Sequence, residues 1–230
     1  MFAEEQSARL GGKKTRRFVV KVCGITNLED ALKSIELGAN ALGFNFYLQS
    51  PRYIDQGEVE KIIQKLPEDV LTVAVMVVSA EDVLSTTAKA SSRVPSIGAF
   101  QLHGLHSESE LPSAHKPLYV ATSPVEAQRF PNHEILIDTS WGRGKTANWE
   151  ELRQLDRPFI LSGGLRPENV AEAIELLQPA GVDVCSGVEK APGTKDVGKL
   201  RRFMENVRGA KNRSQQSRRV NLNHGKEIKP

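Results

Sequence analysis

Eight apolar runs alternate with helical patterns along most of this chain, and that alternation constrains the fold more than any other feature. The runs are rich in Val, Ile and Leu without polar alternation, which is typical of parallel strands buried on both faces. We expect strands at residues 18–23, 40–46, 70–78, 97–102, 117–121, 134–138, 158–162 and 182–186. We expect helices near residues 28–37, 55–66, 81–91, 106–113, 123–130, 149–155, 167–177 and 196–207. Eight strand–helix units over about 190 residues predict an α/β fold with a single domain, the (β/α)8 or TIM barrel.

Two of the expected helices, at 106–113 and 123–130, have weak periodicity. If these segments are not helical, a doubly wound open sheet fits the same pattern. The two ends of the chain, residues 1–16 and 209–230, show no periodicity. We therefore expect a flexible N-terminal extension at 1–16, a barrel at 17–208 and a disordered basic tail at 209–230.

Basic charge gathers at the two ends of the chain rather than on the expected barrel. Residues 209–230 hold six Lys or Arg and one Glu, whereas residues 1–16 hold four Lys or Arg and two Glu. Because the whole chain carries a net charge of +3, residues 17–208 carry −4. A mildly acidic barrel does not suit nucleic acid, so we expect no nucleic-acid partner. We expect the tail to be solvated, the alternative being contact with RNA or membrane phosphates.

The sequence also indicates a compartment. Its longest apolar runs, such as residues 73–78, are far shorter than the roughly 20 residues of a membrane-spanning helix. Residues 1–16 lack the apolar centre of a signal peptide. Two cysteines, Cys23 and Cys185, do not make the disulfide framework of a small secreted domain. We therefore expect a cytoplasmic protein with no membrane partner.

Candidate site residues follow the expected strands, at the edge where barrels build their sites. Cys23 ends the first strand, before a helix that Asn27 is placed to cap. This cysteine is either a small buried hydrophobe or a reactive thiol. Arg52, in the loop after the second strand, offers a planar fork for a carboxylate or a phosphate, the alternative being a surface arginine.

His103 and Asp138 end the fourth and sixth strands. A histidine in this position is either a hydrogen-bonded packing group or a proton carrier. An aspartate that closes an apolar strand is either a loop hydrogen-bond acceptor or a site carboxylate. Residues 141–146, which read Trp-Gly-Arg-Gly-Lys-Thr, lack the spacing of a P-loop, and we interpret them as a loop that faces the substrate.

Small-residue turns follow the seventh and eighth strands. They are Ser162-Gly163-Gly164 and Ser186-Gly187. Glycines let backbone N–H groups approach an anion, and barrels hold phosphates in these two loops. Plain tight turns are the alternative, but two such turns in these two places favour a phosphate-binding site.

Residues 18–208 as a whole resemble the phosphoribosylanthranilate isomerase family of tryptophan biosynthesis. The resemblance rests on six blocks in the family's order and spacing. They are Lys21-Val22-Cys23-Gly24-Ile25-Thr26-Asn27 with Glu29-Asp30-Ala31; Gly43-Phe44 with Phe46-Tyr47 and Ser50-Pro51-Arg52-Tyr53-Ile54; Gln101-Leu102-His103-Gly104; Asp138; Leu161-Ser162-Gly163-Gly164-Leu165 with Pro167-Glu168-Asn169-Val170; and Val182-Asp183-Val184 with Ser186-Gly187-Val188-Glu189 and Pro192-Gly193. The chain departs from the family at Cys185, where a serine is usual, and at the shortened element Gly142-Arg143-Gly144. The resemblance implies the barrel fold and a reaction that needs neither a metal nor an organic cofactor.

The family catalyses an Amadori rearrangement, which converts N-(5-phosphoribosyl)anthranilate into 1-(2-carboxyphenylamino)-1-deoxyribulose 5-phosphate. By resemblance, Cys23 acts as a thiolate base on the C2′ proton, and Asp138 acts as the acid that opens the sugar ring. Arg52 matches the residue that pairs with the anthranilate carboxylate. The residues that match the phosphate cradle are Gly163, Gly164, Ser186 and Gly187. The resemblance thus implies a small-molecule sugar phosphate as partner, and we expect a monomer or a homodimer.

Two alternative functions stay open. The related barrel isomerase of histidine biosynthesis is expected to carry an aspartate at the end of its first strand, where this chain has Cys23. A phosphate-binding barrel subunit without catalysis would not need both Cys23 and Asp138. The sequence therefore favours the isomerase of tryptophan biosynthesis.

Overall fold

The computed structural model describes residues 17–112, 116–138 and 149–224. Eight parallel strands close into a barrel in chain order, and the last strand pairs back onto the first. The strands are β1 Val19–Cys23, β2 Ala41–Asn45, β3 Leu71–Val77, β4 Ala99–His103, β5 Leu118–Thr122, β6 Glu134–Asp138, β7 Ile160–Ser162 and β8 Gly181–Val184. This closed sheet confirms the predicted TIM barrel and excludes the doubly wound open sheet.

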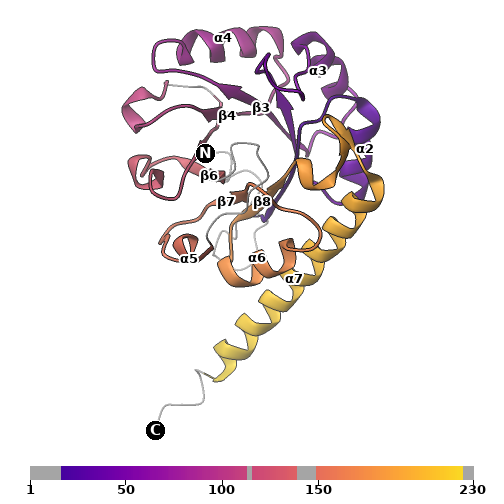
Figure 1. Ribbon diagram of the computed structural model, residues 1–230, viewed down its shortest axis with the longest axis vertical. Coiled ribbons are helices and arrows are strands. Elements are labelled where there is room, and N and C mark those ends of the chain that lie inside the picture. The colour runs from indigo at the N-terminus through magenta and orange to yellow at the C-terminus, as the bar shows by residue number, and fades with distance from the viewer. Residues whose placement is uncertain (1–16, 113–115, 139–148, 225–230) are drawn as a thin grey trace.

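Helices cover the outside of the barrel (Figure 1). They are α2 Leu28–Leu37, α3 Gln56–Ile63, α4 Val83–Arg93, α5 Trp149–Leu152, α6 Val170–Leu177 and α7 Val197–His224. The 3-10 turn η3 Ser186–Val188 and a hairpin of β9 Glu189–Ala191 and β10 Thr194–Lys195 lie between β8 and α7. The predicted cap of α2 is confirmed, because the Asn27 side chain accepts a hydrogen bond from the backbone N–H of Asp30 at 2.8 Å.

At the two weakly periodic segments the structure contains only single 3-10 turns, η1 Glu108–Glu110 and η2 Ala127–Arg129. The helices expected at 106–113 and 123–130 were therefore wrong. Pro112 limits the first segment, because a helix usually ends at or before the residue that precedes a proline, whereas Pro124 stands at the start of the second segment, where proline is tolerated. The barrel closes nonetheless, because β4, β5 and β6 pair directly with one another.

The side chains of the strands point either outward, toward the helices, or into the barrel. Val20 and Val22 of β1 point outward into the main apolar core, which lies between the strands and the helices. A separate apolar cluster inside the barrel consists of Val19, Tyr119, Ala121, Leu136 and Ile160. Successive side chains of a strand alternate between its two faces, so Lys21 and Cys23 share the inner face of β1 with Val19. The apolar cluster is thus the floor of the barrel, and Lys21 and Cys23 lie progressively nearer its C-terminal rim.

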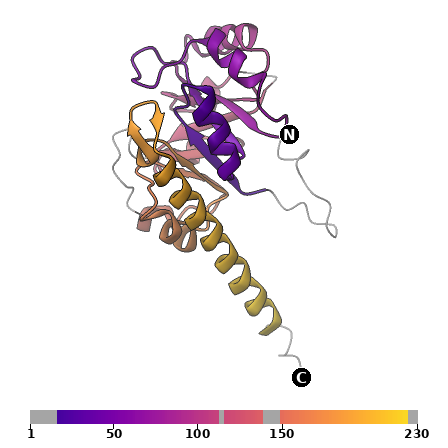
Figure 2. The same ribbon diagram turned by 90° about the vertical axis from the view of Figure 1, so that its right-hand side faces the viewer.

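The last helix is longer than the sequence predicted. We expected it to end near residue 207, but α7 continues to His224 and extends past the body of the barrel (Figure 2). Three features hold its first additional turn against the barrel. Ala210 is buried, and Lys211 Nζ lies 4.8 Å from the centroid of the Phe18 ring. Arg213 forms a 2.6 Å ion pair with Glu175. Residues 210–224 contain no Gly or Pro to stop a helix, and their Lys and Arg side chains suit a helix C-terminus.

The expected extension at 1–16 and the last part of the expected tail, 225–230, lie outside the described residues. Among the helices of the described ranges, none is long and apolar enough to span a membrane.

Candidate active site

The C-terminal ends of the parallel strands bring the predicted polar residues to one rim of the barrel. Cys23 ends β1, His103 ends β4 and Asp138 ends β6. Ser162 ends β7, and Ser186 opens η3 just after β8. The predicted substrate-facing loop at 141–146 lies outside the described residues. The predicted base, the predicted acid and the two small-residue turns thus meet at the same end of the barrel.

The Cys23 thiol is buried among charged and polar groups. Its Sγ accepts a hydrogen bond from the Cys185 thiol, and its backbone oxygen accepts one from Lys195 Nζ at 2.5 Å. The pKa of Cys23 is lowered from 9.0 to about 7, and the hydrogen bond from Cys185 is the largest cause, although burial opposes the change. The ammonium groups of Lys21 and Lys195 contribute to this lower value, and Asp183 acts against them. A sizeable fraction of Cys23 is therefore thiolate at neutral pH, as a base requires.

A buried ion pair lies one layer below this thiol. Lys21 Nζ donates to Asp183 Oδ1 at 2.9 Å, and the two side chains are only 3% and 4% exposed. Ser162 Oγ donates to the other carboxylate oxygen at 3.1 Å. Burial alone would lower the pKa of Lys21, but Asp183 and Cys23 raise it above its ordinary value, so the side chain is an ammonium ion. Our sequence analysis gave this pair no role, although a lone charge inside an apolar strand was a signal for it.

Arg52 lies at the same rim but is paired with a carboxylate of the chain itself. Its Nε lies 3.0 Å from both carboxylate oxygens of Glu189, and its Nη2 lies 2.7 Å from Oε2. The Arg52 side chain is 16% exposed, which excludes the surface-arginine alternative. A Cβ built on Gly24 would lie 2.6 Å from Arg52 Cδ and 2.9 Å from Cys185 Sγ, so the arginine is close to the thiols. Arg52 therefore belongs to the site, with Glu189 as its partner in this structure.

Glu189 connects the β9–β10 hairpin to the rim. Besides Arg52, its Oε1 accepts hydrogen bonds from Lys195 Nζ at 3.0 Å and from the backbone N–H of Gly193 at 3.2 Å. Lys195 also donates to the backbone of Cys23. The sequence motif contained Glu189, but we assigned it no role because its arginine partner is 137 residues away in the chain. The hairpin thus ties together the end of β1 and the loop that carries Arg52.

His103 is a half-buried histidine in its neutral form. Its Nε2 accepts a hydrogen bond from the side-chain amide of Gln101 at 2.9 Å. Burial lowers the pKa of His103, and Lys21 acts in the same direction against the nearby Asp138. A neutral imidazole held by Gln101 fits the hydrogen-bonded packing interpretation. Asp138, at the end of β6, is partly exposed at the same rim.

The two small-residue turns are in direct contact. Gly163 and Gly164 adopt φ values of +87° and +67°, which glycine reaches without strain. A Cβ built on Gly187 would lie 1.9 Å from the backbone oxygen of Leu165, so no side chain fits there. The turns after β7 and β8 therefore form one closely packed stretch of backbone that also includes Ser186, as a phosphate cradle requires.

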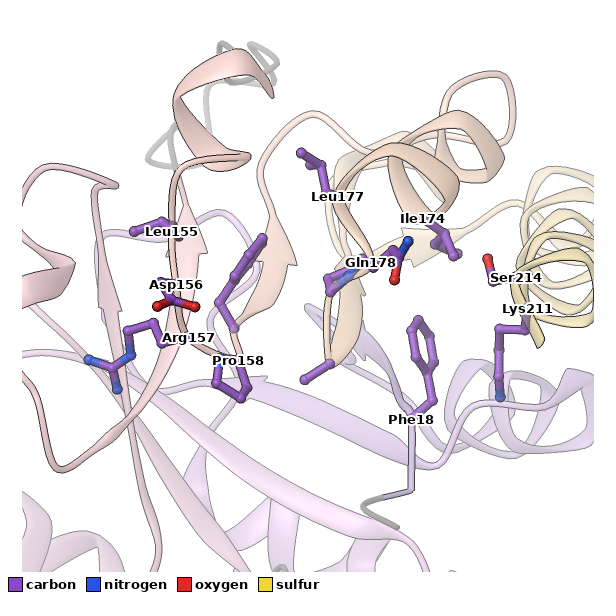
Figure 3. Close-up of a pocket in the computed structure, with 13 residues that line it drawn as sticks. Phe18, Leu155, Asp156, Arg157, Pro158, Ile174, Leu177, Gln178, Lys211 and Ser214 are labelled. Atoms are coloured by element: carbon purple, nitrogen blue, oxygen red, sulfur yellow. The ribbon is translucent and has the colours of Figure 1, made fainter. Parts of the chain in front are cut away.

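One pocket lies away from this rim. A pocket of about 820 Å³ lies at the opposite end of the barrel, between the segments that enter β7 and β8 and the helices α6 and α7 (Figure 3). Its walls include Phe18, Leu177 and Lys211, and none of the candidate site residues lines it. No three His, Cys, Asp or Glu side chains of the described ranges are grouped to hold a metal ion.

Sequence comparisons point to one enzyme family. A model of the family N-(5'phosphoribosyl)anthranilate (PRA) isomerase matches residues 20–206. The N-(5'-phosphoribosyl)anthranilate isomerase of Thermotoga neapolitana is 40% identical over 209 residues, which cover 83% of this chain and 98% of that protein. The relative of the same name from Trichlorobacter lovleyi is 39% identical over 207 residues, with the same coverage of both chains.

Solved structures show the same similarity. The crystal structure of phosphoribosyl anthranilate isomerase from Thermotoga maritima has a TM-score of 0.74 and 38% identity, and the match covers 84% of this chain and 99% of that one. A structure of the enzyme in complex with reduced 1-(o-carboxyphenylamino)-1-deoxyribulose 5-phosphate has a TM-score of 0.71, 37% identity and the same coverage. The chain described here, with its barrel, its rim thiol and its paired glycine turns, belongs to the phosphoribosylanthranilate isomerase family.

Proposed function

We propose that this protein converts N-(5'-phosphoribosyl)anthranilate into 1-(2-carboxyphenylamino)-1-deoxyribulose 5-phosphate, an aldose–ketose isomerisation of tryptophan biosynthesis. The observation that carries the proposal is the low-pKa thiol of Cys23 at the same rim as Asp138 and the two glycine turns. Family membership supports the substrate, because a structure of the family holds a reduced form of this product.

The reaction needs one acid and one base. Asp138 acts as the acid toward the ring oxygen of the sugar, so that the ring opens and the C1′–nitrogen bond becomes an iminium. The Cys23 thiolate then removes the C2′ proton, and the electron pair of the broken C–H bond moves to form the enolamine. The enolamine tautomerises to the ketose. Lys21 stabilises the thiolate before the proton is taken, because its ammonium group is held beside Cys23.

The two ends of the substrate are bound separately. We assign the phosphate to the backbone of Gly163, Gly164, Ser186 and Gly187. We assign the anthranilate carboxylate to the guanidinium of Arg52. Arg52 must then share its donors between Glu189 and the substrate or turn away from Glu189. Lys195 and the backbone of Gly193 keep their hydrogen bonds to Glu189 in either case, so this carboxylate stays compensated.

The wider setting is part of the same proposal. We infer a catalytic domain over residues 17–208 that acts in the cytoplasm on a small-molecule sugar phosphate, without a nucleic-acid partner. We infer a monomer or a homodimer. A structure of generated monomers of the dimeric Thermotoga maritima enzyme supports both forms for a relative.

The decrease of substrate fluorescence tests the proposed activity, because the aminoaldose is fluorescent and the rearranged product is much less so. With freshly made substrate, the wild-type protein should cause the substrate fluorescence to decrease with time. Cys23→Ala and Asp138→Asn should each lower kcat by at least about a hundredfold with KM little changed, since each removes one proton carrier. Leu84→Ala, on an exposed position of α4, is a matched control and should behave like the wild type.

A wild-type trace that stays flat would overturn the activity. A variant that keeps more than about a tenth of the wild-type kcat would remove its residue from the mechanism, because general acid–base catalysis supplies more than that. His103 would then be the next proton carrier to test.

A further inference from the structure

The two cysteines of this chain meet at the seam where the barrel closes. Strands β1 and β8 pair in register, with Lys21 opposite Asp183 and Val22 opposite Val184. Cys23 is the last residue of β1, and Cys185 comes directly after β8. Lys21 and Asp183 join across the inside of the barrel, and Cys23 shares that inner face of β1 with Lys21. Cys185 Sγ lies 2.9 Å from a Cβ built on Gly24, the residue after Cys23. The two thiols are accordingly within hydrogen-bond contact.

The neighbouring residues leave the thiols facing each other. A Cβ built on Gly43 would lie 2.8 Å from Cys23 Sγ, and one built on Gly24 would lie 2.9 Å from Cys185 Sγ. At positions 24 and 43 a side chain larger than that of glycine would therefore collide with one of the two sulfur atoms. Paired strands lie about 4.8 Å apart, and the Cα atoms of disulfides lie about 4.4–6.8 Å apart. The spacing of the strands that lead to the two cysteines is therefore within the range that a disulfide bridges.

We propose that Cys23 and Cys185 form a site of reversible oxidation by hydroperoxides, and that their disulfide disables the active site by consuming its base. The cross-link follows from the geometry alone, whereas the loss of catalysis rests on the function proposed above. The resemblance drawn from the sequence implies a serine at the position of Cys185, so the second thiol is a departure of this chain from that pattern.

The chemistry divides between the two thiols according to their surroundings. Cys23 carries the thiolate, with Lys21 beside it, so its sulfur attacks the hydroperoxide first. A sulfur–oxygen bond forms, the O–O bond breaks, and water or an alcohol leaves, which oxidises Cys23 to a sulfenic acid. The Cys185 sulfur then attacks the Cys23 sulfur, the S–S bond forms and the S–O bond breaks. The leaving hydroxide takes the Cys185 thiol proton and becomes water. Two thiols are thus oxidised by two electrons while one hydroperoxide is reduced.

Glu189 assists the second step. Its Oε1 lies 3.8 Å from Cys185 Sγ, so it can receive the thiol proton once Cys23 is no longer a thiolate that accepts it. Arg52 and Lys195 hold this carboxylate in its charged form. It can therefore pass the proton from Cys185 to the leaving hydroxide as that sulfur attacks. Cys185 is also the more exposed of the two cysteines, so a dithiol reductant can reach the disulfide through it.

The test treats the purified full-length protein with hydrogen peroxide, removes the excess, and maps the cysteines by mass spectrometry without reduction. We expect one intramolecular Cys23–Cys185 peptide, the loss of both titratable thiols, and at least a tenfold fall in isomerase activity that dithiothreitol restores. Cys185→Ser is the matched variant, because it keeps a hydrogen-bond donor but has no second sulfur. Without that sulfur, peroxide should drive Cys23 to the sulfinic acid, and dithiothreitol should not restore the variant's own starting activity.

Three results would overturn the proposal. In the first, oxidised wild-type protein contains Cys23 as a sulfinic acid and Cys185 still as a thiol. In the second, the disulfides join two chains instead of lying within one. In the third, dithiothreitol restores the activity of Cys185→Ser to the same extent as that of the wild type. The peptide map does not depend on activity. Protein that forms the internal disulfide but never shows isomerase activity would refute the proposed function and leave the oxidation site standing.

Discussion

Replacing Cys185 with alanine should raise the pKa of the catalytic thiol. The Cys185 thiol donates a hydrogen bond to Cys23 Sγ, and this bond is the largest cause that lowers the pKa of Cys23 from 9.0 to about 7. Alanine has no donor, whereas serine supplies a hydroxyl of similar reach. The two variants thus differ in whether the thiolate keeps its hydrogen bond.

The size of the effect follows from the hydrogen bond that is lost. A hydrogen bond to a charged group contributes about 1.5–3 kcal/mol, and a thiol is a weak donor, so the lower end applies. At about 1.4 kcal/mol per tenfold change in protonation, the pKa of Cys23 should rise by roughly one in Cys185→Ala. The thiolate fraction at pH 7 then falls from about a half to about a tenth, and the reaction with an alkylating agent slows about fivefold.

Alkylation kinetics can measure this because the chain contains only two cysteines, so either variant has Cys23 as its one thiol. The rate with iodoacetamide, followed from roughly pH 5 to pH 10, should show an inflection near pH 7 in Cys185→Ser and about one pH unit higher in Cys185→Ala. Identical inflections in the two variants would refute the reasoning. The ammonium groups of Lys21 and Lys195 would then account for the thiolate without Cys185.

Two further predictions concern Arg52 and the end of α7. Arg52→Ala should raise KM about ten- to a hundredfold with little change in kcat, because it removes a charge-assisted bidentate contact with the substrate and not a proton carrier. Steady-state fluorescence assays measure both constants, and an unchanged KM would contradict the assignment. Deletion of residues 210–230 should keep kcat/KM within about threefold of the wild type, because the site lies at the other end of the barrel. The same deletion should lower the free energy of unfolding in urea by about 1–2 kcal/mol relative to deletion of 215–230, because only the longer one removes the buried Ala210 and the Lys211–Phe18 contact; equal stabilities would contradict this.

The sequence predicted the barrel because parallel strands buried on both faces leave a plain pattern of continuous apolar runs. It predicted the rim because Cys23, Asp138 and the glycine turns each come directly after such a run, and parallel strands bring their ends together. The errors were at segments where local propensity and tertiary packing disagree. The segments after β4 and β5 form only 3-10 turns, and packing onto α6 lengthened α7 beyond its apolar periodicity.

Partners far apart in the chain were harder to predict. Arg52 was recognised as a site residue, but its contact with Glu189 leaves no local pattern, because the loop and the hairpin that carry them meet only when the barrel closes. The approach of Cys185 to Cys23 likewise depends on the exact register of β1 on β8. Lys21 and Asp183 differ from these cases, since a lone charged residue within an apolar strand signals a buried partner even before that partner is known.

The Lys21–Asp183 pair should therefore be dispensable for stability but needed for the reactivity of Cys23. Lys21→Met leaves Asp183 buried with only the Ser162 hydroxyl as a partner, and should lower the free energy of unfolding by about 3–5 kcal/mol. The double variant Lys21→Met/Asp183→Asn leaves no charge unpaired and should recover most of that loss, because neutral groups of similar size often replace buried ion pairs without cost.

Reactivity should not recover in the same way. Lys21 lowers the pKa of Cys23 more than Asp183 raises it, so the double variant should keep a thiol pKa above that of the wild type. Urea denaturation and alkylation of the Cys185→Ser background measure the two effects separately. A double variant that regains both the wild-type stability and the wild-type thiol pKa would show that the ion pair does not determine the pKa of Cys23. One that stays as unstable as Lys21→Met would show that the ion pair holds the barrel together. The expected separation, with stability regained and reactivity not, means that the charges beneath Cys23 serve its ionisation.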